Sequence, residues 1–195
     1  MEVQELKKQC RSELRQKLRA LEAAYVQASD KGIFEKLVQM PQWKNARTVF
    51  MYVSMGNEPD TRRLLQEALA AGKRVCVPRC QSGGMMDVQC IDGMHQLAPA
   101  AFGLLEPDES AVTVAPQELD LVIAPCVAAD RACRRLGNGG GYYDRYLPQV
   151  HCPVVCLCRQ QLLQNSLPVE DCDAPVDMVL TDEVLLQSGA QEELV

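Results

Sequence analysis

A strand–helix–strand pattern between residues 48 and 77 restricts the fold of this chain more than any other feature. Residues 48–53 read TVFMYV and suit a buried strand, residues 61–71 have helical periodicity, and Gly72 ends that helix before a second apolar strand at 75–77. Strands joined through a crossover helix run parallel in one sheet. The pattern therefore predicts an α/β domain with a mostly parallel sheet flanked by helices.

A glycine-rich segment, RRLGNGGGYYDRYL at 134–147, follows the apolar run 119–127. Four of the five residues 137–141 are glycines, so the backbone can adopt positive φ angles and turn successive N–H groups toward one oxyanion. A helix that starts near Tyr142 would add its positive end, and Arg134 and Arg135 would add charge. A glycine-rich phosphate loop between a strand and a helix is the predicted arrangement.

The glycine segment could also be a loop with a purely structural role. Glycine-rich turns between strands and helices are common in proteins that bind nothing there, so this alternative stays open. The dinucleotide motif G-x-G-x-x-G needs glycine where Tyr142 stands, and G-x-x-x-x-G-K-[ST] does not occur in the chain. The spacing therefore supports neither a Rossmann dehydrogenase nor a P-loop NTPase.

The loop 54–59 is expected to lie beside the glycine loop. It leaves the carboxyl end of strand 48–53, as the glycine loop leaves that of the strand within 119–127. If both strands belong to one parallel sheet, both loops lie at the edge where open α/β sheets bind ligands. Glu58 is then a candidate site residue.

Length and charge limit the class of protein. The chain has 195 residues, a formal net charge of −6 and a pI near 5.0, which predicts a single domain over 1–195 and argues against nucleic acid or an anionic membrane as a partner. No apolar run approaches 18 residues, and the N-terminal segment MEVQELKK is charged where a signal peptide would be apolar. A cytoplasmic protein is predicted.

The N-terminal segment predicts one helix over 4–28, with an apolar stripe at three- and four-residue spacing, and a second helix over 30–39. Lys7, Arg11 and Arg15 lie beside the stripe, each four residues apart. Like charges at this spacing repel unless an anion or a carboxylate lies between them. Both solvated decoration and anion binding are consistent with these three cations.

Further strands are predicted at 85–91, 153–158 and 177–180, with an ordered loop at 98–107. The chain contains ten cysteines without a C-x-x-C pair, and His95 and His151 are not spaced as zinc-finger ligands. Buried free thiols are predicted in preference to a metal site or disulfides.

The glycine segment also resembles the signature of a known family. Residues 135–144 read RLGNGGGYYD, which is similar to the R-L-G-x-G-x-G-Y-Y-D signature of 5-formyltetrahydrofolate cyclo-ligases. Similar order and spacing cover nearly the whole chain: KKQCRSELR at 7–15, MGNE at 55–58, Pro78-Arg79, Glu106-Pro107 and the aspartate region 167–181.

The resemblance implies the ring closure of 5-formyltetrahydrofolate to 5,10-methenyltetrahydrofolate, with ATP consumed, ADP and phosphate released and Mg²⁺ required. In the mechanism proposed for the family, the formyl oxygen attacks the γ-phosphate, and N10 attacks the imidoyl phosphate before phosphate leaves. Phosphorylation converts a poor leaving group into a good one, so the protein supplies mainly positioning and charge stabilisation.

The same resemblance implies roles for individual residues. Arg135, Tyr142 and Glu58 are the implied catalytic residues. The implied ATP-binding residues are Lys7, Arg11, Arg135, Gly137, Asn138, Gly139, Gly140, Gly141, Tyr142 and Tyr143. The implied folate-binding residues are Val53, Met55, Glu58, Phe102, Asn138 and Tyr142, although Phe102 could equally close the core. Asp144 and Asp173 match positions expected to serve Mg²⁺.

Four positions depart from the family pattern. Ala129 and Cys133 stand where an aromatic residue and a glycine are common, Asn138 where a basic or bulky residue is usual, and Cys80 where a larger side chain is common. Loss of a charge at Asn138 is expected to weaken the binding of phosphate or of the folate carboxylates.

Two other functions therefore stay open. One is an idle homologue that binds nucleotide or reduced folate, and the other is an ATP-dependent ligase or kinase acting on another amide. A monomer is the default expectation.

Overall fold

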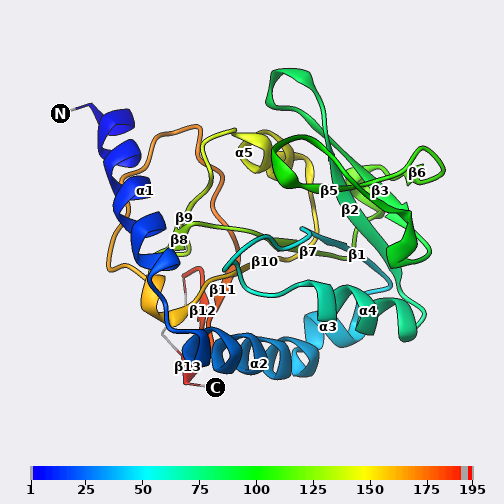
Figure 1. Cartoon of the computed structure of the whole chain (residues 1–195), viewed down its shortest axis with the longest axis horizontal. Helices are drawn as coiled ribbons and strands as arrows, with labels where there is room; N and C mark the ends of the chain where they lie inside the picture. The colour runs from blue at the N-terminus through cyan, green and yellow to red at the C-terminus, as the bar shows by residue number, and fades with distance from the viewer. Residues whose placement is uncertain (1, 190–192, 195) are drawn as a thin grey trace.

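The computed structural model describes residues 2–189 and 193–194, except for the side chain of Phe102 and those of the last two residues. Within these residues the chain forms a nine-stranded sheet in the order β13-β12-β11-β10-β7-β1-β2-β3-β6 (Figure 1). The strands are β1 Thr48–Met51, β2 Arg74–Cys80, β3 Met86–Ile91, β6 Val112–Thr113, β7 Leu121–Ala124, β10 Val154–Leu157, β11 Met178–Leu180, β12 Val184–Gln187 and β13 Glu193–Leu194.

The centre of the sheet is parallel. Strands β2, β1, β7, β10 and β11 pair in the same direction, and antiparallel strands extend the sheet at both edges. The predicted α/β class with a mostly parallel central sheet is confirmed. The strands are short apolar runs because both of their faces are buried.

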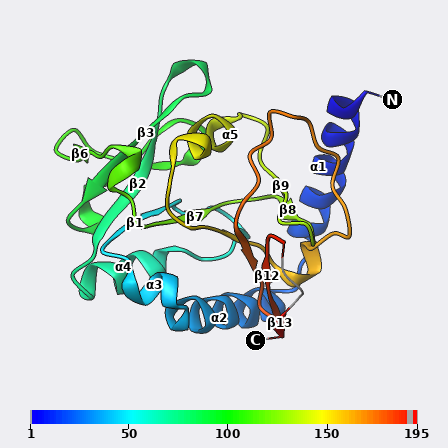
Figure 2. The ribbon, with the colours of Figure 1, turned by 180° about the vertical axis from the view of Figure 1, so that it is seen from behind.

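Helices cover the two faces of the sheet. They are α1 Val3–Arg19, α2 Ala23–Gln39, α3 Pro41–Asn45, α4 Arg62–Ala70 and α5 Tyr142–Tyr146. Figures 1 and 2 show α2, α3 and α4 on one face, α5 on the other, and α1 at the edge where β1 and β7 end. Alternate residues divide accordingly: Met51 and Ile123 pack on the side of α2, whereas Phe50 and Val122 pack on the side of α5.

The predicted helix over 4–28 is wrong, because two helices occupy this region. The Ala20 N–H closes α1 on the carbonyls of Gln16 and Lys17, and Glu22 has extended backbone angles before α2. A straight helix could not lie across the sheet edge and then cover a sheet face, so tertiary packing overrides helix propensity here.

Two short hairpins were not predicted. The expected loop at 98–107 contains β4 Leu97–Pro99 paired with β5 Leu105–Pro107. Between β7 and the glycine loop, β8 Ala128–Ala129 pairs with β9 Arg135–Leu136. Strands of two or three residues are too short to produce a periodic pattern in the sequence.

The prediction of buried free thiols is confirmed for four of the ten cysteines: two others form a disulfide, and four are free but not buried. Cys76 and Cys90 are joined in a disulfide, because they lie directly opposite each other in the antiparallel pair of β2 and β3. The other eight cysteines are free, and four of them are buried. Within the described part of the chain, no helix is both long and apolar enough to span a membrane.

Candidate active site

A cavity of about 400 Å³ lies at the carboxyl edge of β1 and β7. It is bounded by the glycine loop 137–141, the loop 54–59 and helix α1. Most of the predicted site residues line it: Arg11, Val53, Met55, Glu58, Arg135, Gly137, Asn138, Gly139, Gly140, Gly141, Tyr142, Tyr143, Asp144 and Asp173. Lys7 lies outside the lining, and the side chain of Phe102 lies outside the described residues.

The glycine loop exposes its backbone toward this cavity. Gly139 and Gly141 have φ angles of 98° and 70°, which disfavour residues with a side chain. A Cβ atom at Gly140 would lie 2.7 Å from the ring of Tyr142. Within the described chain, no N–H group of residues 137–141 donates a hydrogen bond to another residue. Several free donors in a turn suit a bound anion such as phosphate.

The helix after the loop contributes less than the sequence predicted. Helix α5 has only five residues and continues as a 3-10 turn over Leu147–Gln149. A helix of this length has few aligned peptide dipoles. An anion at this site would therefore be attracted mainly by the free amides of the glycine loop.

Helix α1 binds the glycine loop through two arginines. The Arg11 Nε donates to the carbonyl of Gly137 at 2.8 Å, and the Arg15 Nη2 donates to the carbonyl and side-chain oxygen of Asn138 at 2.9 and 3.1 Å. The four-residue spacing thus places these cations beside loop oxygens. Arg11 and Arg15 are therefore not merely solvated surface charges, because both are hydrogen-bonded to the glycine loop.

Lys7 binds the segment near the C-terminus. It is 4% exposed and donates to Glu170 at 2.8 Å and to Asp173 at 2.6 Å. Burial alone would lower the pKa of Lys7, but the hydrogen bonds and charges of Asp173 and Glu170 outweigh it and raise the pKa. Lys7 therefore stays charged and connects α1 to this acidic segment.

Arg135 carries an unused hydrogen-bond donor at the cavity. Its side chain is 2% exposed, its Nη2 donates to Asp144 at 2.7 Å, and its buried Nε has no partner in the described chain. A buried donor without an acceptor is costly. Arg134 was also expected to add charge beside the glycine loop. It lies outside the cavity lining and instead pairs with the buried Asp130 at 2.7 Å.

Glu58 places a partly desolvated carboxylate in the same cavity. The carboxylate accepts a hydrogen bond from the Met55 N–H at 2.9 Å. Burial raises the pKa of Glu58, and the Met55 N–H together with the nearby side chain of Asn138 offsets the increase only in part.

The two tyrosines differ in their surroundings. Tyr143 stacks on Phe50 with 5.8 Å between ring centroids, and its hydroxyl is buried without a partner in the described chain. Burial raises the pKa of Tyr143 far above its usual range. Tyr142 lies against the glycine loop and presents its ring to the cavity.

Carboxylates gather beside the glycine loop. Asp173 and Glu170 form a cluster with Cys172 in which the ligand atoms lie within 4.8 Å of one another, and Asp144 lies outside this cluster. Asp144 and Asp173 both line the cavity, paired with Arg135 and Lys7. Oxygen donors of this kind suit Mg²⁺, which would replace these cations as their partner.

Cys80 and Glu106 line the cavity but were not predicted as site residues. The Cys80 N–H donates to the Glu106 carboxylate at 3.0 Å, and burial with the nearby Glu106 raises the pKa of the Cys80 thiol to about 11. The motif Glu106-Pro107 was a signal in the sequence. Its position depended on the hairpin of β4 and β5, which the sequence did not predict.

Known proteins are similar to this chain over most of its length. The Escherichia coli (strain K12) 5-formyltetrahydrofolate cyclo-ligase is 32% identical over 174 residues, which cover 86% of this chain and 96% of that protein. The Mus musculus protein of the same name is 27% identical over 194 residues, which cover 93% and 96%. The NMR structure of Aquifex aeolicus 5,10-methenyltetrahydrofolate synthetase has a TM-score of 0.85 at 27% identity, and the match covers 97% of this chain and 96% of that one.

The profile of one protein family matches residues 3–182, which include every element of the cavity described above. The chain therefore belongs to the 5-formyltetrahydrofolate cyclo-ligase family.

Proposed function

We propose that the protein uses ATP and Mg²⁺ to close 5-formyltetrahydrofolate to 5,10-methenyltetrahydrofolate, releasing ADP and phosphate. The observation that carries the proposal is that one cavity is lined by the free amides of residues 137–141, by the side chain of Arg135 and by the desolvated carboxylate of Glu58. The first two suit a triphosphate, and the third suits the N–H groups of a reduced pterin.

The proposed chemistry needs two reactants side by side. The formyl oxygen attacks the γ-phosphorus and ADP leaves; N10 then attacks the activated carbon, and the former formyl oxygen leaves with the phosphate. Arg135 and the loop amides stabilise charge on the phosphate oxygens, while Glu58 orients the folate. Val53 and Met55 provide the apolar wall beside Glu58.

Asp144 and Asp173 are the residues that would hold Mg²⁺, which would neutralise phosphate charge. Lys7 and Arg11 are proposed to contact the phosphates from α1. Lys7 already has two carboxylate partners, so it would have to exchange at least one of them.

Two of the four departures from the family pattern lie outside the cavity lining. Ala129 and Cys133 are fully buried core residues. Cys133 has a φ angle of 57°, which explains why glycine is common there. At Asn138, the charge of Arg15 lies within hydrogen-bonding distance of the amide. A cytoplasmic location and a monomeric state remain predictions from the sequence.

The test is to mix the purified protein with 5-formyltetrahydrofolate and Mg·ATP and follow the near-ultraviolet absorbance of the methenyl product together with ADP. Product and ADP in equal amounts are expected. Tight folate binding without turnover would instead identify an idle homologue. ADP release only with another amide acceptor would identify a different ligase or kinase.

A further inference from the structure

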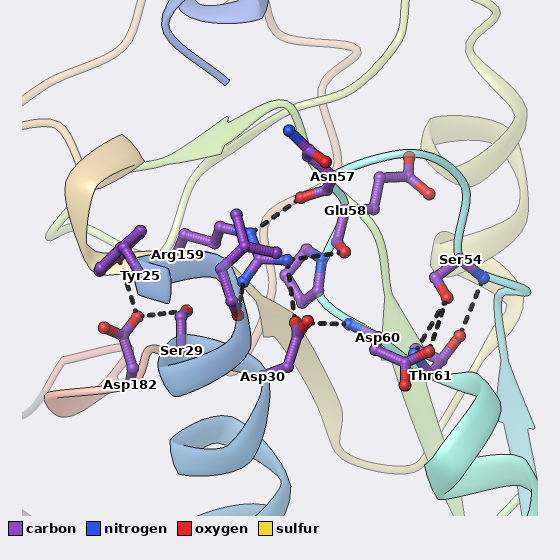
Figure 3. Close-up of polar contacts among 12 residues, drawn as sticks. Tyr25, Ser29, Asp30, Ser54, Asn57, Glu58, Asp60, Thr61, Arg159 and Asp182 are labelled. Carbon is purple, nitrogen blue, oxygen red and sulfur yellow. Dashed lines mark hydrogen bonds and ion pairs between the residues drawn. The ribbon is translucent and has the colours of Figure 1, made fainter. Parts of the chain in front are cut away.

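A fully buried arginine lies directly behind the Glu58 loop, on the side away from the cavity lining. Arg159 follows β10, is 0% exposed and does not line the cavity. Its Nε donates to the carbonyl of Asn57 at 2.8 Å, its Nη2 donates to the carbonyl of Glu58 at 3.0 Å, and its Nη1 donates to the carbonyl of Val26 in α2 at 3.2 Å (Figure 3). One planar group therefore binds two successive carbonyls of the loop.

The same guanidinium is neutralised from α2. The Nη2 of Arg159 lies 2.8 Å from the Asp30 carboxylate, which also accepts the backbone N–H of Asp60 at 3.0 Å. Asp30 thus connects Arg159 to the far end of the loop. A buried charge is tolerated only with such partners, and all three nitrogens of the side chain have one.

The base of the loop is closed by a separate pair. Ser54 N–H donates to the Thr61 hydroxyl at 2.9 Å, and Thr61 N–H donates to the Ser54 hydroxyl at 3.2 Å. These contacts fix the ends of the loop but do not reach its tip. At the tip of the loop, the buried side chain of Arg159 binds the backbone carbonyls of residues 57 and 58.

The orientation of Glu58 follows from these contacts. Figure 3 shows the Glu58 carbonyl directed toward Arg159 and its carboxylate directed away from it. The carboxylate lines the cavity, where the Met55 N–H holds it. Because a backbone carbonyl and its side chain are fixed relative to each other by φ, ψ and the rotamer, holding the carbonyl limits where the carboxylate can point.

We propose that Arg159 is a positioning residue that holds the Glu58 carboxylate in the orientation needed to bind the substrate. The inference rests on the proposed function, since it assumes that Glu58 binds the folate. Arg159 itself touches neither reactant, so its effect should fall on folate binding and leave the ATP side of the cavity unchanged.

Arg159→Lys is the test variant. Lysine keeps the charge beside Asp30 but cannot reproduce the planar fork that binds Asn57, Glu58 and Val26 together. The KM for 5-formyltetrahydrofolate should rise about tenfold while the KM for Mg·ATP stays within about twofold. Combined with Glu58→Ala, the lysine substitution should add little, because both changes remove the same interaction.

Asp182→Asn is the matched control. Figure 3 shows Asp182 beside Tyr25 and Ser29, which both donate to it, and apart from Ser54, Asn57, Glu58 and Asp60. Asp182 also accepts the Gln160 N–H, so it joins the same helix to the residue after Arg159. It should lower the melting temperature without changing either KM. If Arg159→Lys lowers the melting temperature but leaves the folate KM unchanged, or raises both KM values equally, Arg159 is only structural and the proposal is wrong.

A readout without turnover separates this proposal from the proposed function. The amides of Met55 and Glu58 are hydrogen-bonded within the loop, and their hydrogen exchange in the free protein should be about tenfold faster in Arg159→Lys and unchanged in Asp182→Asn. Wild-type protein without ligase activity would refute the function, while unchanged exchange would refute the role of Arg159. If the lysine variant does not fold, Asp30→Asn should accelerate the same two amides, and its failure to do so would also refute that role.

Discussion

At the scale of single residues, two adjacent arginines have different partners. Arg135 lines the cavity and pairs with Asp144, whereas Arg134 lies outside the lining and forms an ion pair with the buried Asp130. We expect Arg135→Ala to lower kcat/KM for ATP about 100-fold, because it removes charge stabilisation from the phosphate. Steady-state kinetics with varied ATP measure this loss. The melting temperature should also fall, because Asp144 loses its charged partner.

Arg134→Ala is the control for that prediction. It leaves Asp130 without its charged partner, so the melting temperature should fall while the KM for ATP stays within about twofold. Unchanged ATP kinetics in Arg135→Ala would remove this residue from the active site.

Glu58 is expected to reduce stability while it supports binding. Burial raises its pKa above the ordinary 4.5, so the native protein favours the protonated form. Preferential protonation of Glu58 in the folded state stabilises the fold relative to the unfolded chain. This stabilisation is fully present below pH 4.5 and is lost as the pH rises through the higher pKa of the folded state. Glu58→Gln imitates the protonated form at every pH.

The glutamine variant should therefore melt at a higher temperature than the wild type at pH 7.5, and the difference should shrink as the pH is lowered toward 5. Folate affinity should fall about 10- to 100-fold, because hydrogen bonds to a charged group are lost. Melting curves and folate titrations over this pH range test both effects. A variant that melts at a lower temperature than wild type at pH 7.5 would contradict the desolvation argument.

At the scale of elements, the glycine loop joins backbone geometry to binding. Gly139 has a φ angle of 98° inside the loop, and Gly72 has a φ of 73° after α4, where a Cβ would meet nothing within 4 Å. Alanine at either position should cost about 1–2 kcal/mol of stability. Only Gly139→Ala should also raise the KM for ATP, because it reorients the amides.

Thermal melts and ATP kinetics of the two glycine variants test this expectation. Equal loss of stability with ATP kinetics altered by neither variant would show that the loop geometry is structural.

Elements with a strong periodic pattern were predictable, and those fixed by long-range packing were not. The apolar runs around β1, β7 and β10 predicted the parallel core, since each is buried on both faces. The break between α1 and α2 and the hairpin of β8 and β9 depend on contacts distant in the sequence. The cavity residues of both loops were found because parallel strands bring their carboxyl ends to one edge.

Parts of the site could not be predicted from the sequence because they depend on side-chain geometry. Composition and charge alone do not distinguish Arg134 from Arg135; the family signature begins at Arg135, and in the structure Arg134 pairs with Asp130 while Arg135 lines the cavity. Arg159 lies about 100 residues from the loop that it holds, with separations of 102 and 101 residues to Asn57 and Glu58.

At the scale of the whole molecule, ionic contacts join the N-terminal helix to the segment near the C-terminus. Lys7 binds both Glu170 and Asp173, but only Asp173 lines the cavity. We expect Asp173→Asn to raise the Mg²⁺ concentration for half-maximal activity about tenfold, because it removes a charged oxygen donor. Magnesium titrations at saturating ATP measure the shift.

Glu170→Gln provides the comparison, since it also removes an ion pair with Lys7 but lies outside the cavity lining. Its melting temperature should fall about as much as that of Asp173→Asn. Because Glu170 also belongs to the cluster with Asp173 but lies outside the cavity lining, its magnesium titration should shift less than that of Asp173→Asn. An unchanged magnesium titration in Asp173→Asn would exclude Asp173 as a metal ligand.

The most direct test of the central claim is a crystal structure of the protein with magnesium, a non-hydrolysable ATP analogue and 5-formyltetrahydrofolate. The account predicts the triphosphate on the N–H groups of residues 137–141 and on Arg135, with the pterin against Glu58 in the same cavity. A triphosphate bound elsewhere, with the glycine loop closed on itself, would contradict it.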